Sequence, residues 1–216
     1  MKTEVRTDYH DNVRRDVFSL ITKDGGVVLD VGGGVGATAR AIRLEGLCDR
    51  VGVIDLVAPP IELGAIDFSY AGSLEDPSFL DRVVSEQGPF DTILCLDVLE
   101  HLIDPWATVA RLHRSIKKGG TMVASIPNVR HLSVVGPLLL KGSWKLDDEG
   151  ILDRTHLRFF VKQSAVELLT SSGLKLEIVQ ALLPDNTRAG RLNRFTAGLF
   201  EDFLTVQYAI RVRRTD

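Results

Sequence analysis

The sequence lacks a long apolar run, and cysteine is scarce. The most apolar window, "SVVGPLLL" at 133–140, is far too short to span a bilayer, so we expect no membrane span. The two cysteines, Cys48 and Cys95, lie among apolar residues, which favours buried thiols in a reduced compartment over a disulfide scaffold. The first residues, "MKTEVRTDYHDN", contain no apolar run and do not resemble a secretory signal. We therefore expect a cytoplasmic protein.

An excess of positive charge is also missing. The net charge is −3 and the pI is about 6.0, so the composition indicates no nucleic-acid partner. Repeats and low-complexity segments are absent as well. With 216 residues, 44% of them hydrophobic, the chain is long enough for one sizeable core, and we expect a single domain over 1–216.

What the sequence does contain is a regular alternation of short apolar runs and helical segments. Repeated β-α-β units of this kind imply a parallel sheet with helices on both faces. A short connection between the last two strands indicates an antiparallel strand at one edge. The expected strands are at 27–31, 50–56, 66–70, 90–98, 121–127, 174–182 and 205–213, and the expected helices at 37–46, 104–118 and 161–171.

The stretch "LDVGGGVG" joins the first strand to the first helix, which places backbone N–H groups and a positive helix end beside a ligand. Two nucleotide classes fit it. Gly32, Gly34 and Ala37 match the G-x-G-x-x-G/A pattern of dinucleotide binders, with Asp55 placed for a ribose contact. Gly32, Gly34 and Gly36 match the D/E-x-G-x-G-x-G pattern of S-adenosylmethionine binders. Asp30 favours the second class, because a carboxylate repels a pyrophosphate and attracts the ammonium and sulfonium charges.

Further cofactor contacts are expected at the carboxyl ends of the following strands, where open α/β sheets bind their ligands. Asp55 ends the second strand, with Leu56 after it, and a carboxylate there can accept both ribose hydroxyls. Other candidates are Ser73 and Leu74 beside the adenine, Asp97 after the fourth strand, and Tyr9, which with His10 can close over the cofactor.

Together these residues resemble a class I S-adenosylmethionine-dependent methyltransferase. The similarity runs from about Tyr9 to Arg213 and rests on "VLDVGGGVG", "GVID", "FDTILCLDVLEHLIDPW" and "LHRSIKKGGTMVASIPN". The segment "GILDRTHLRFF" at 150–160 resembles a bacterial branch often found beside glycan and natural-product pathways. The resemblance implies a Rossmann-like seven-stranded sheet of order 3-2-1-4-5-7-6, with strand 7 antiparallel.

The resemblance also divides the domain into parts. It implies an N-terminal helix at about 8–22, a cofactor-binding half at about 25–127, an acceptor-side lid and cap at about 128–160, and C-terminal helix and strand elements at 161–213. The sequence departs from the family pattern at two places. Pro59 and Pro60 forbid an ordinary helix after the second strand, and Ser73 stands where many relatives carry an aspartate for the adenine amino group.

Catalysis requires little more than positioning, because the cofactor supplies the electrophilic methyl group. A hydroxyl acceptor also needs a base, and imidazole titrates near neutral pH. His156 and His101 are the candidates, with Asp153 placed to orient His156 and Asp97 as a third candidate base. A capping or supporting role for each histidine stays open. We expect no metal.

The expected activity is S-adenosylmethionine-dependent methylation of a small-molecule acceptor, O-directed, on a sugar, a glycan intermediate or a secondary metabolite. The product cofactor is S-adenosylhomocysteine, and a homodimer is left open. One alternative is an NAD(P)-dependent oxidoreductase, against which the missing Tyr-x-x-x-Lys pair counts. Another is a non-catalytic S-adenosylmethionine-binding protein.

Overall fold

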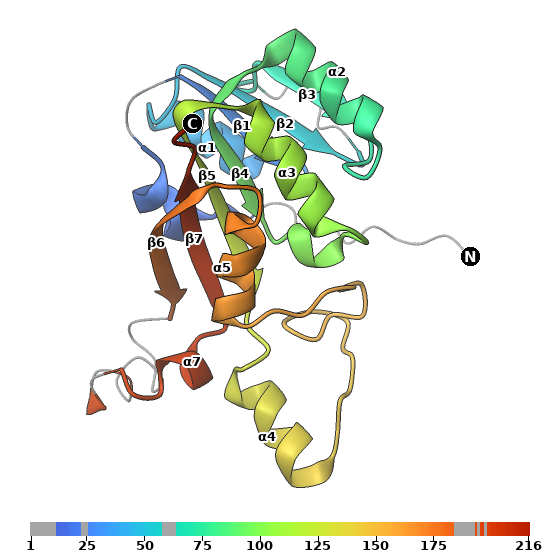
Figure 1. Cartoon of the computed structure of the whole chain (residues 1–216), viewed down its shortest axis with the longest axis vertical. Coiled ribbons are helices and arrows are strands. Elements are labelled where there is room, and N and C mark those ends of the chain that lie inside the picture. Colours follow the sequence, from blue (N-terminus) through green and yellow to red (C-terminus); the bar gives the residue numbers. More distant parts are fainter. Residues whose placement is uncertain (1–11, 23–25, 58–63, 184–192, 194, 197) are drawn as a thin grey trace.

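The computed structural model describes residues 12–22, 26–57, 64–183, 193, 195–196 and 198–216. Within this part of the chain seven strands form one sheet in the order β3-β2-β1-β4-β5-β7-β6 (Figure 1). β7 is antiparallel to both of its neighbours, and the other pairs are parallel, so the predicted order and the antiparallel strand 7 are confirmed. The antiparallel strand is not at the edge, because β7 lies between β5 and the edge strand β6. The strands are β1 (Val27–Val31), β2 (Arg50–Asp55), β3 (Phe68–Ala71), β4 (Phe90–Leu96), β5 (Ile116–Pro127), β6 (Lys175–Leu182) and β7 (Gln207–Arg213).

Helices cover both faces of this sheet. One face carries α1 (Ala37–Leu44) and the 3-10 helix η2 (Arg15–Leu20). The other face carries α2 (Pro77–Gln87), α3 (Pro105–Ser115) and α5 (Lys162–Thr170). The remaining helices are η4 (Leu99–His101), α4 (Leu132–Lys141) and α7 (Glu201–Leu204).

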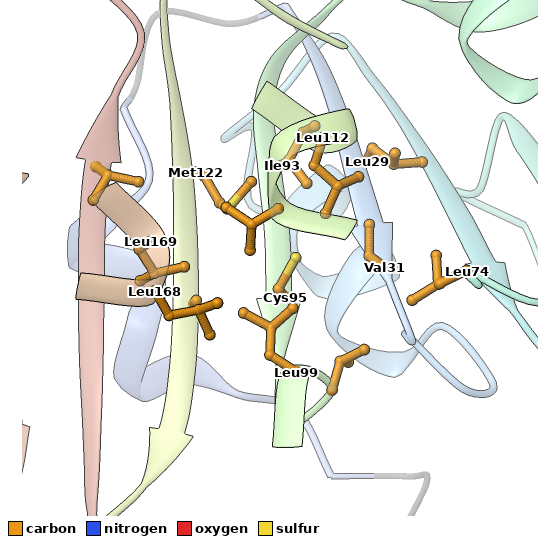
Figure 2. Close-up of a cluster of buried hydrophobic side chains, with 14 of the residues drawn as sticks. Leu29, Val31, Leu74, Ile93, Cys95, Leu99, Leu112, Met122, Leu168 and Leu169 are labelled. Carbon is orange, nitrogen blue, oxygen red and sulfur yellow. The ribbon is translucent and has the colours of Figure 1, made fainter. Parts of the chain in front are cut away.

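The apolar strand runs exist because the central strands are buried on both faces. In β1, Val28 packs toward α1 and η2, whereas Leu29 and Val31 belong to the cluster under α2, α3 and α5. Figure 2 shows this second cluster, in which Leu112 of α3 and Leu168 of α5 meet the strands. Cys48 and Cys95 are free and buried, as predicted.

The helix predicted at 104–118 begins where expected and ends earlier. Asp104 caps α3 by accepting a hydrogen bond from the Ala107 amide at 3.0 Å. At its other end Ile116 already belongs to β5, because its buried side chain packs in the core and its carbonyl accepts from Arg214 at 2.8 Å. The "KKGG" stretch, predicted as a turn before the strand, is an irregular part of β5, with Gly119 at φ +80°.

The helices α2 and α4 were not predicted. The start of α2 has the same Asp-Pro sequence as the start of α3, because Asp76 caps the Ser78 amide at 2.9 Å and Pro77 occupies the first turn. α4 projects away from the sheet (Figure 1), and only Val134 of its side chains is buried.

The N-terminal helix expected at about 8–22 appears in the described residues as the shorter η2, and Tyr9 lies outside them. No helix in the described ranges is long and apolar enough to cross a bilayer.

Candidate active site

The glycine turn between β1 and α1 has a backbone conformation that residues with a side chain rarely adopt. Gly32, Gly34 and Gly36 have φ values of +69°, +54° and +76°, in the left-handed region that favours glycine. The Gly32 amide donates to the Ile54 carbonyl at 2.7 Å. A Cβ atom on Gly32 would lie 2.3 Å from Cγ2 of Val98. The turn therefore exposes backbone rather than side chains beside the start of α1.

A cavity of about 820 Å³ opens at this turn, beyond the carboxyl ends of β1, β2 and β4. This is the place where open α/β sheets bind ligands, and its size suits a cofactor together with a small acceptor. Gly36 is not part of the lining. The predicted residues that do line it are Asp30, Gly32, Gly34, Asp55, Leu56, Ser73, Leu74, Asp97, His101, Asp153 and His156.

Asp30 lies in β1, at the base of the cavity, and is only 2% exposed. Its Oδ2 atom is buried without a hydrogen-bond partner among the described residues. Burial, with a smaller contribution from the Asp55 carboxylate, raises the pKa of Asp30 to about 7. The free site therefore holds a carboxyl group whose ionised form needs a positive partner.

Asp55 ends β2 and is tied to two backbone amides. Its Oδ2 accepts from Gly34 at 2.9 Å, and its Oδ1 accepts from Val57 at 3.2 Å. Each carboxylate oxygen keeps further lone-pair capacity, so Asp55 supports the glycine turn and still faces the cavity as an acceptor. Its neighbour Leu56 is 74% exposed.

Ser73 and Leu74 form the cavity wall after β3. The Ser73 hydroxyl accepts from the Glu75 amide at 3.2 Å, which closes a local turn. Leu74 is 9% exposed and packs in the core with Phe79, so its side chain both fills the core and borders the cavity.

Asp97 follows β4 in a left-handed conformation, φ +58°, that non-glycine residues rarely adopt. Its carboxylate pairs with Arg14 and accepts from Gln207 and from Ser125, the last at 3.3 Å. Burial raises the pKa of Asp97, and the Arg14 guanidinium opposes that rise. Sequence reasoning missed Arg14 and Gln207, because they lie 83 and 110 positions from Asp97.

The two predicted histidines meet at one side of the cavity. The rings of His101 and His156 pack edge to face with centroids 4.7 Å apart. The Nδ1 atom of His156 lies 3.1 Å from the Ile151 carbonyl oxygen. The Nδ1 atom of His101 lies 3.3 Å from the Thr155 carbonyl oxygen. Burial, and then the neighbouring His156, lowers the pKa of His101.

Asp153 does not orient His156, contrary to the prediction. Its Oδ1 accepts from the amide and the hydroxyl of Thr155, at 2.7 and 2.6 Å. The same hydroxyl lies 3.2 Å from Nδ1 of His101. The imidazole backed by this carboxylate is therefore His101, and His156 is held by a backbone carbonyl instead.

Glu100 has a carboxylate oxygen within 4.8 Å of a ring nitrogen of each imidazole and is only 1% exposed. Neither of its carboxylate oxygens has a hydrogen-bond partner in another described residue. Burial, and then the Asp97 charge, raises the pKa of Glu100 well above its usual value. The sequence motif contained this residue in a Glu-His pair, but nothing in the local pattern indicated its complete burial.

The segment at about 128–160, expected as an acceptor-side lid and cap, borders the cavity only near its C-terminal end. Gly150, Ile151, Asp153, Thr155 and His156 border the cavity, and none of the lining residues comes from 128–149. The Leu157 and Arg158 amides both donate to the Glu100 carbonyl, which fixes this segment beside η4. α4 is directed elsewhere, since the chain before it is anchored by Asn128 Nδ2 to the Asp202 and Thr205 carbonyls.

A family model described as a methyltransferase domain matches residues 1–179. The chain belongs to this methyltransferase family. The match confirms the predicted class I S-adenosylmethionine-dependent methyltransferase, and with it the choice of S-adenosylmethionine over a nicotinamide dinucleotide.

Two curated relatives of this methyltransferase share one name. The chain is 30% identical over 178 residues to the ubiquinone biosynthesis O-methyltransferase of Xylella fastidiosa strain M23, covering 76% of this chain and 71% of the relative. It is 29% identical over 185 residues to the ubiquinone biosynthesis O-methyltransferase of Xanthomonas campestris pv. campestris strain B100, covering 80% and 73%.

Solved structures show the same fold. The 1,6-didemethyltoxoflavin-N1-methyltransferase of Burkholderia thailandensis, which contains S-adenosylhomocysteine, aligns with a TM-score of 0.60 at 20% identity over 94% of this chain and 78% of that one. An S-adenosylmethionine-dependent methyltransferase from Mesorhizobium loti aligns with a TM-score of 0.59 at 18% identity over 92% and 96%.

Proposed function

We propose that this methyltransferase transfers the methyl group of S-adenosylmethionine to a hydroxyl oxygen of a small molecule. The observation that carries the proposal is that the glycine turn and the His101–His156 pair border one cavity of about 820 Å³. A cofactor and an acceptor bound there would be in direct contact. The names of the curated relatives, ubiquinone biosynthesis O-methyltransferases, support oxygen as the methylated atom.

The residues around the turn suit the cofactor's charges. Asp30 holds a buried oxygen without a partner among the described residues, which fits the cofactor's ammonium group. The positive end of α1 faces the cofactor's carboxylate across the glycine turn, whose Gly32 and Gly34 amides already donate to Ile54 and Asp55. Asp55 retains acceptor capacity for the ribose hydroxyls. We assign the remaining cofactor contacts to Leu56, Ser73, Leu74 and Asp97, and when bound the cofactor supplies an electrophilic methyl group.

The acceptor would lie against the polar side of the cavity. Arg14, Asp97 and Gln207 border it on one side, and Asp153 and Thr155 on another. A molecule with several hydroxyl groups can pair with these donors and acceptors without leaving buried polar atoms unsatisfied. This chemistry supports a sugar, a glycan intermediate or a hydroxylated secondary metabolite as the acceptor class.

The acceptor hydroxyl must lose its proton as the new bond forms. An imidazole promotes this loss either by accepting the proton itself or by holding a cation that acidifies the hydroxyl. His156 is the candidate for the first route, with its Nε2 atom available because Nδ1 contacts the Ile151 carbonyl. The two routes differ in whether turnover requires a divalent cation.

The test is mass spectrometry of the purified protein incubated with S-adenosylmethionine and a panel of acceptors. The panel contains sugar nucleotides, free hydroxylated aromatics and matched compounds in which an amine replaces the hydroxyl. We expect a one-methyl mass increase in a hydroxyl acceptor, with fragmentation that places the methyl on oxygen. Methylation of the amine compounds alone would contradict an O-directed activity.

A further inference from the structure

The His101–His156 pair belongs to a cluster of three metal-ligating side chains. Glu100, His101 and His156 each offer one ligand atom, and these atoms all lie within 4.8 Å of one another. Nitrogen and oxygen ligands bind zinc at about 2.0–2.2 Å in a tetrahedral arrangement, so two ligand atoms of one ion lie roughly 3.4 Å apart. Side-chain rotations that bring these atoms closer by up to roughly 1.4 Å would give the cluster this spacing.

The burial of Glu100 is evidence for a bound cation that does not depend on the spacing of the ligand atoms. Its carboxylate is buried, borders the cavity and has no hydrogen-bond partner in another described residue. A buried carboxylate without a partner is costly unless a positive charge compensates it. The Arg14 guanidinium does not take this role alone, because it is paired with Asp97 and Asp16. A cation on the cavity side of Glu100 would satisfy it.

The two imidazoles are oriented as metal ligands usually are. A carbonyl oxygen only accepts hydrogen bonds, so the contacts to Ile151 and Thr155 place the ring proton of each histidine on Nδ1. The Nε2 atoms then carry lone pairs. Proteins commonly hold metal-binding histidines through such a hydrogen bond from the other ring nitrogen.

We propose that Glu100, His101 and His156 bind one divalent first-row transition-metal ion, with open coordination positions facing the cavity. Two imidazoles and one carboxylate favour Mn²⁺, Fe²⁺, Co²⁺ or Zn²⁺ over Mg²⁺ and Ca²⁺, which prefer oxygen ligands alone. Three protein ligands leave room for a water molecule or a substrate oxygen. The sequence indicated no metal site because His156 lies far along the chain from the Glu-His pair.

The use of this ion in catalysis rests on the proposed O-methylation, whereas the site itself does not. An acceptor hydroxyl on an open position becomes more acidic, and its O–H bond breaks with the proton passing to solvent. Its oxygen then forms a bond to the methyl carbon as the carbon–sulfur bond breaks, and the electron pair of that bond stays on sulfur. In this route His156 acts as a ligand rather than as a base.

The test measures Co²⁺ binding to the full chain after treatment with a chelator. Visible absorption and calorimetry are the readouts, and S-adenosylhomocysteine binding reports whether each variant is folded. We expect one Co²⁺ per chain in the wild type and at least about tenfold weaker binding in Glu100→Gln and in His156→Ala, because loss of a supporting residue alone costs that much. His131→Ala is the matched control, since its ring contacts Ser133 at the start of α4, and it should bind Co²⁺ normally.

Unchanged Co²⁺ affinity in both Glu100→Gln and His156→Ala, with cofactor binding intact, would overturn the site. Turnover measurements distinguish metal binding at this site from a role of the metal in catalysis. Loss of turnover on chelation, with recovery on Co²⁺ addition and constant cofactor affinity, supports the catalytic role, and turnover that survives chelation overturns it. Stoichiometric Co²⁺ binding without methylation of any hydroxyl acceptor would instead contradict the O-directed function and leave the site in place.

Discussion

Asp153 is connected to His101 through a hydroxyl group. Oγ1 of Thr155 lies 2.6 Å from Oδ1 of Asp153 and 3.2 Å from Nδ1 of His101. The carboxylate accepts the hydroxyl proton, so the hydroxyl oxygen is free to accept from the imidazole. This relay orients the His101 ring at the end of η4 and directs its other nitrogen away from Thr155.

The relay predicts an effect of Thr155 on metal binding. Thr155→Val removes the hydroxyl and keeps the shape of the side chain, so His101 loses this contact and is held only by the Thr155 carbonyl. We expect Co²⁺ affinity to fall by roughly 10–100-fold, as for other residues that support a ligand. Thr170→Val is the control, because its hydroxyl contacts the Val166 carbonyl within α5. Equal Co²⁺ affinities in the two variants would remove the relay's role.

The cofactor class makes a direct prediction for ligand stabilisation. S-adenosylhomocysteine should bind the folded state and raise the melting temperature. At a hundredfold excess over its dissociation constant, binding adds about 2.7 kcal/mol to the free energy of unfolding. NAD and NADP should leave the melting temperature unchanged, because Asp30 repels a pyrophosphate. Thermal scans with the three ligands at equal concentration test this, and the reverse order would contradict the assignment of the glycine turn.

Asp30 predicts how cofactor affinity depends on pH. Its pKa of about 7 in the free protein lies above the ordinary value, so it is largely protonated below that pH. The cofactor's ammonium group favours the ionised form, and binding therefore releases a proton. Affinity for S-adenosylhomocysteine should rise by up to about tenfold per pH unit as pH approaches 7, and then level off.

The matched variant for this prediction is Asp30→Asn. Calorimetry between about pH 5.5 and pH 8.5 should show weaker and nearly pH-independent binding. The stability of the cofactor-free protein should depend on pH in the opposite sense. A raised carboxyl pKa destabilises the wild type as pH rises from about 4 through 7, so the variant should gain relative stability toward the alkaline side. A variant with the wild-type binding profile would place the titrating group elsewhere.

Asp55 predicts the strength of ribose binding. Asp55→Ala removes charge-assisted hydrogen bonds worth about 1.5–3 kcal/mol. Cofactor affinity should fall by roughly ten- to a hundredfold. Asp55→Asn retains one acceptor oxygen, which can still receive the Gly34 amide, and should fall between the alanine variant and the wild type. If both variants fold and bind like the wild type, the ribose is held by other residues.

His156 predicts a separation between cofactor binding and turnover. It lies in the segment before α5 rather than at the glycine turn, so His156→Ala should leave S-adenosylhomocysteine affinity nearly unchanged. Turnover on a hydroxyl acceptor should fall by roughly 10²–10⁴-fold. The comparison variant is His101→Ala. His101 lies shortly after β4, on the cofactor side of the sheet, so we expect this variant to alter cofactor affinity as well. Full turnover in His156→Ala would make this residue a support for the turn before α5.

The two capped helices show how far local signals reach. Asp104–Pro105 and Asp76–Pro77 begin α3 and α2 with the same chemistry, and of these two helices only the first was predicted from the sequence. The end of α3 is different in kind. Ile116 leaves the helix because it is buried and because Arg214, near the other end of the chain, contacts its carbonyl. No window around Ile116 contains that information.

The sequence by itself determined the strands, the glycine turn and a part of the cavity lining, because burial on both faces of a sheet and left-handed backbone turns impose local patterns that can be read directly. The tertiary structure alone decided which charges meet. The pairing of Arg14 with Asp97, the burial of Glu100 without a partner among the described residues and the packing of His101 on His156 each depend on separate elements coming together. Their energies depend on distance and burial in three dimensions, and these quantities exist only once the sheet and its helices have assembled.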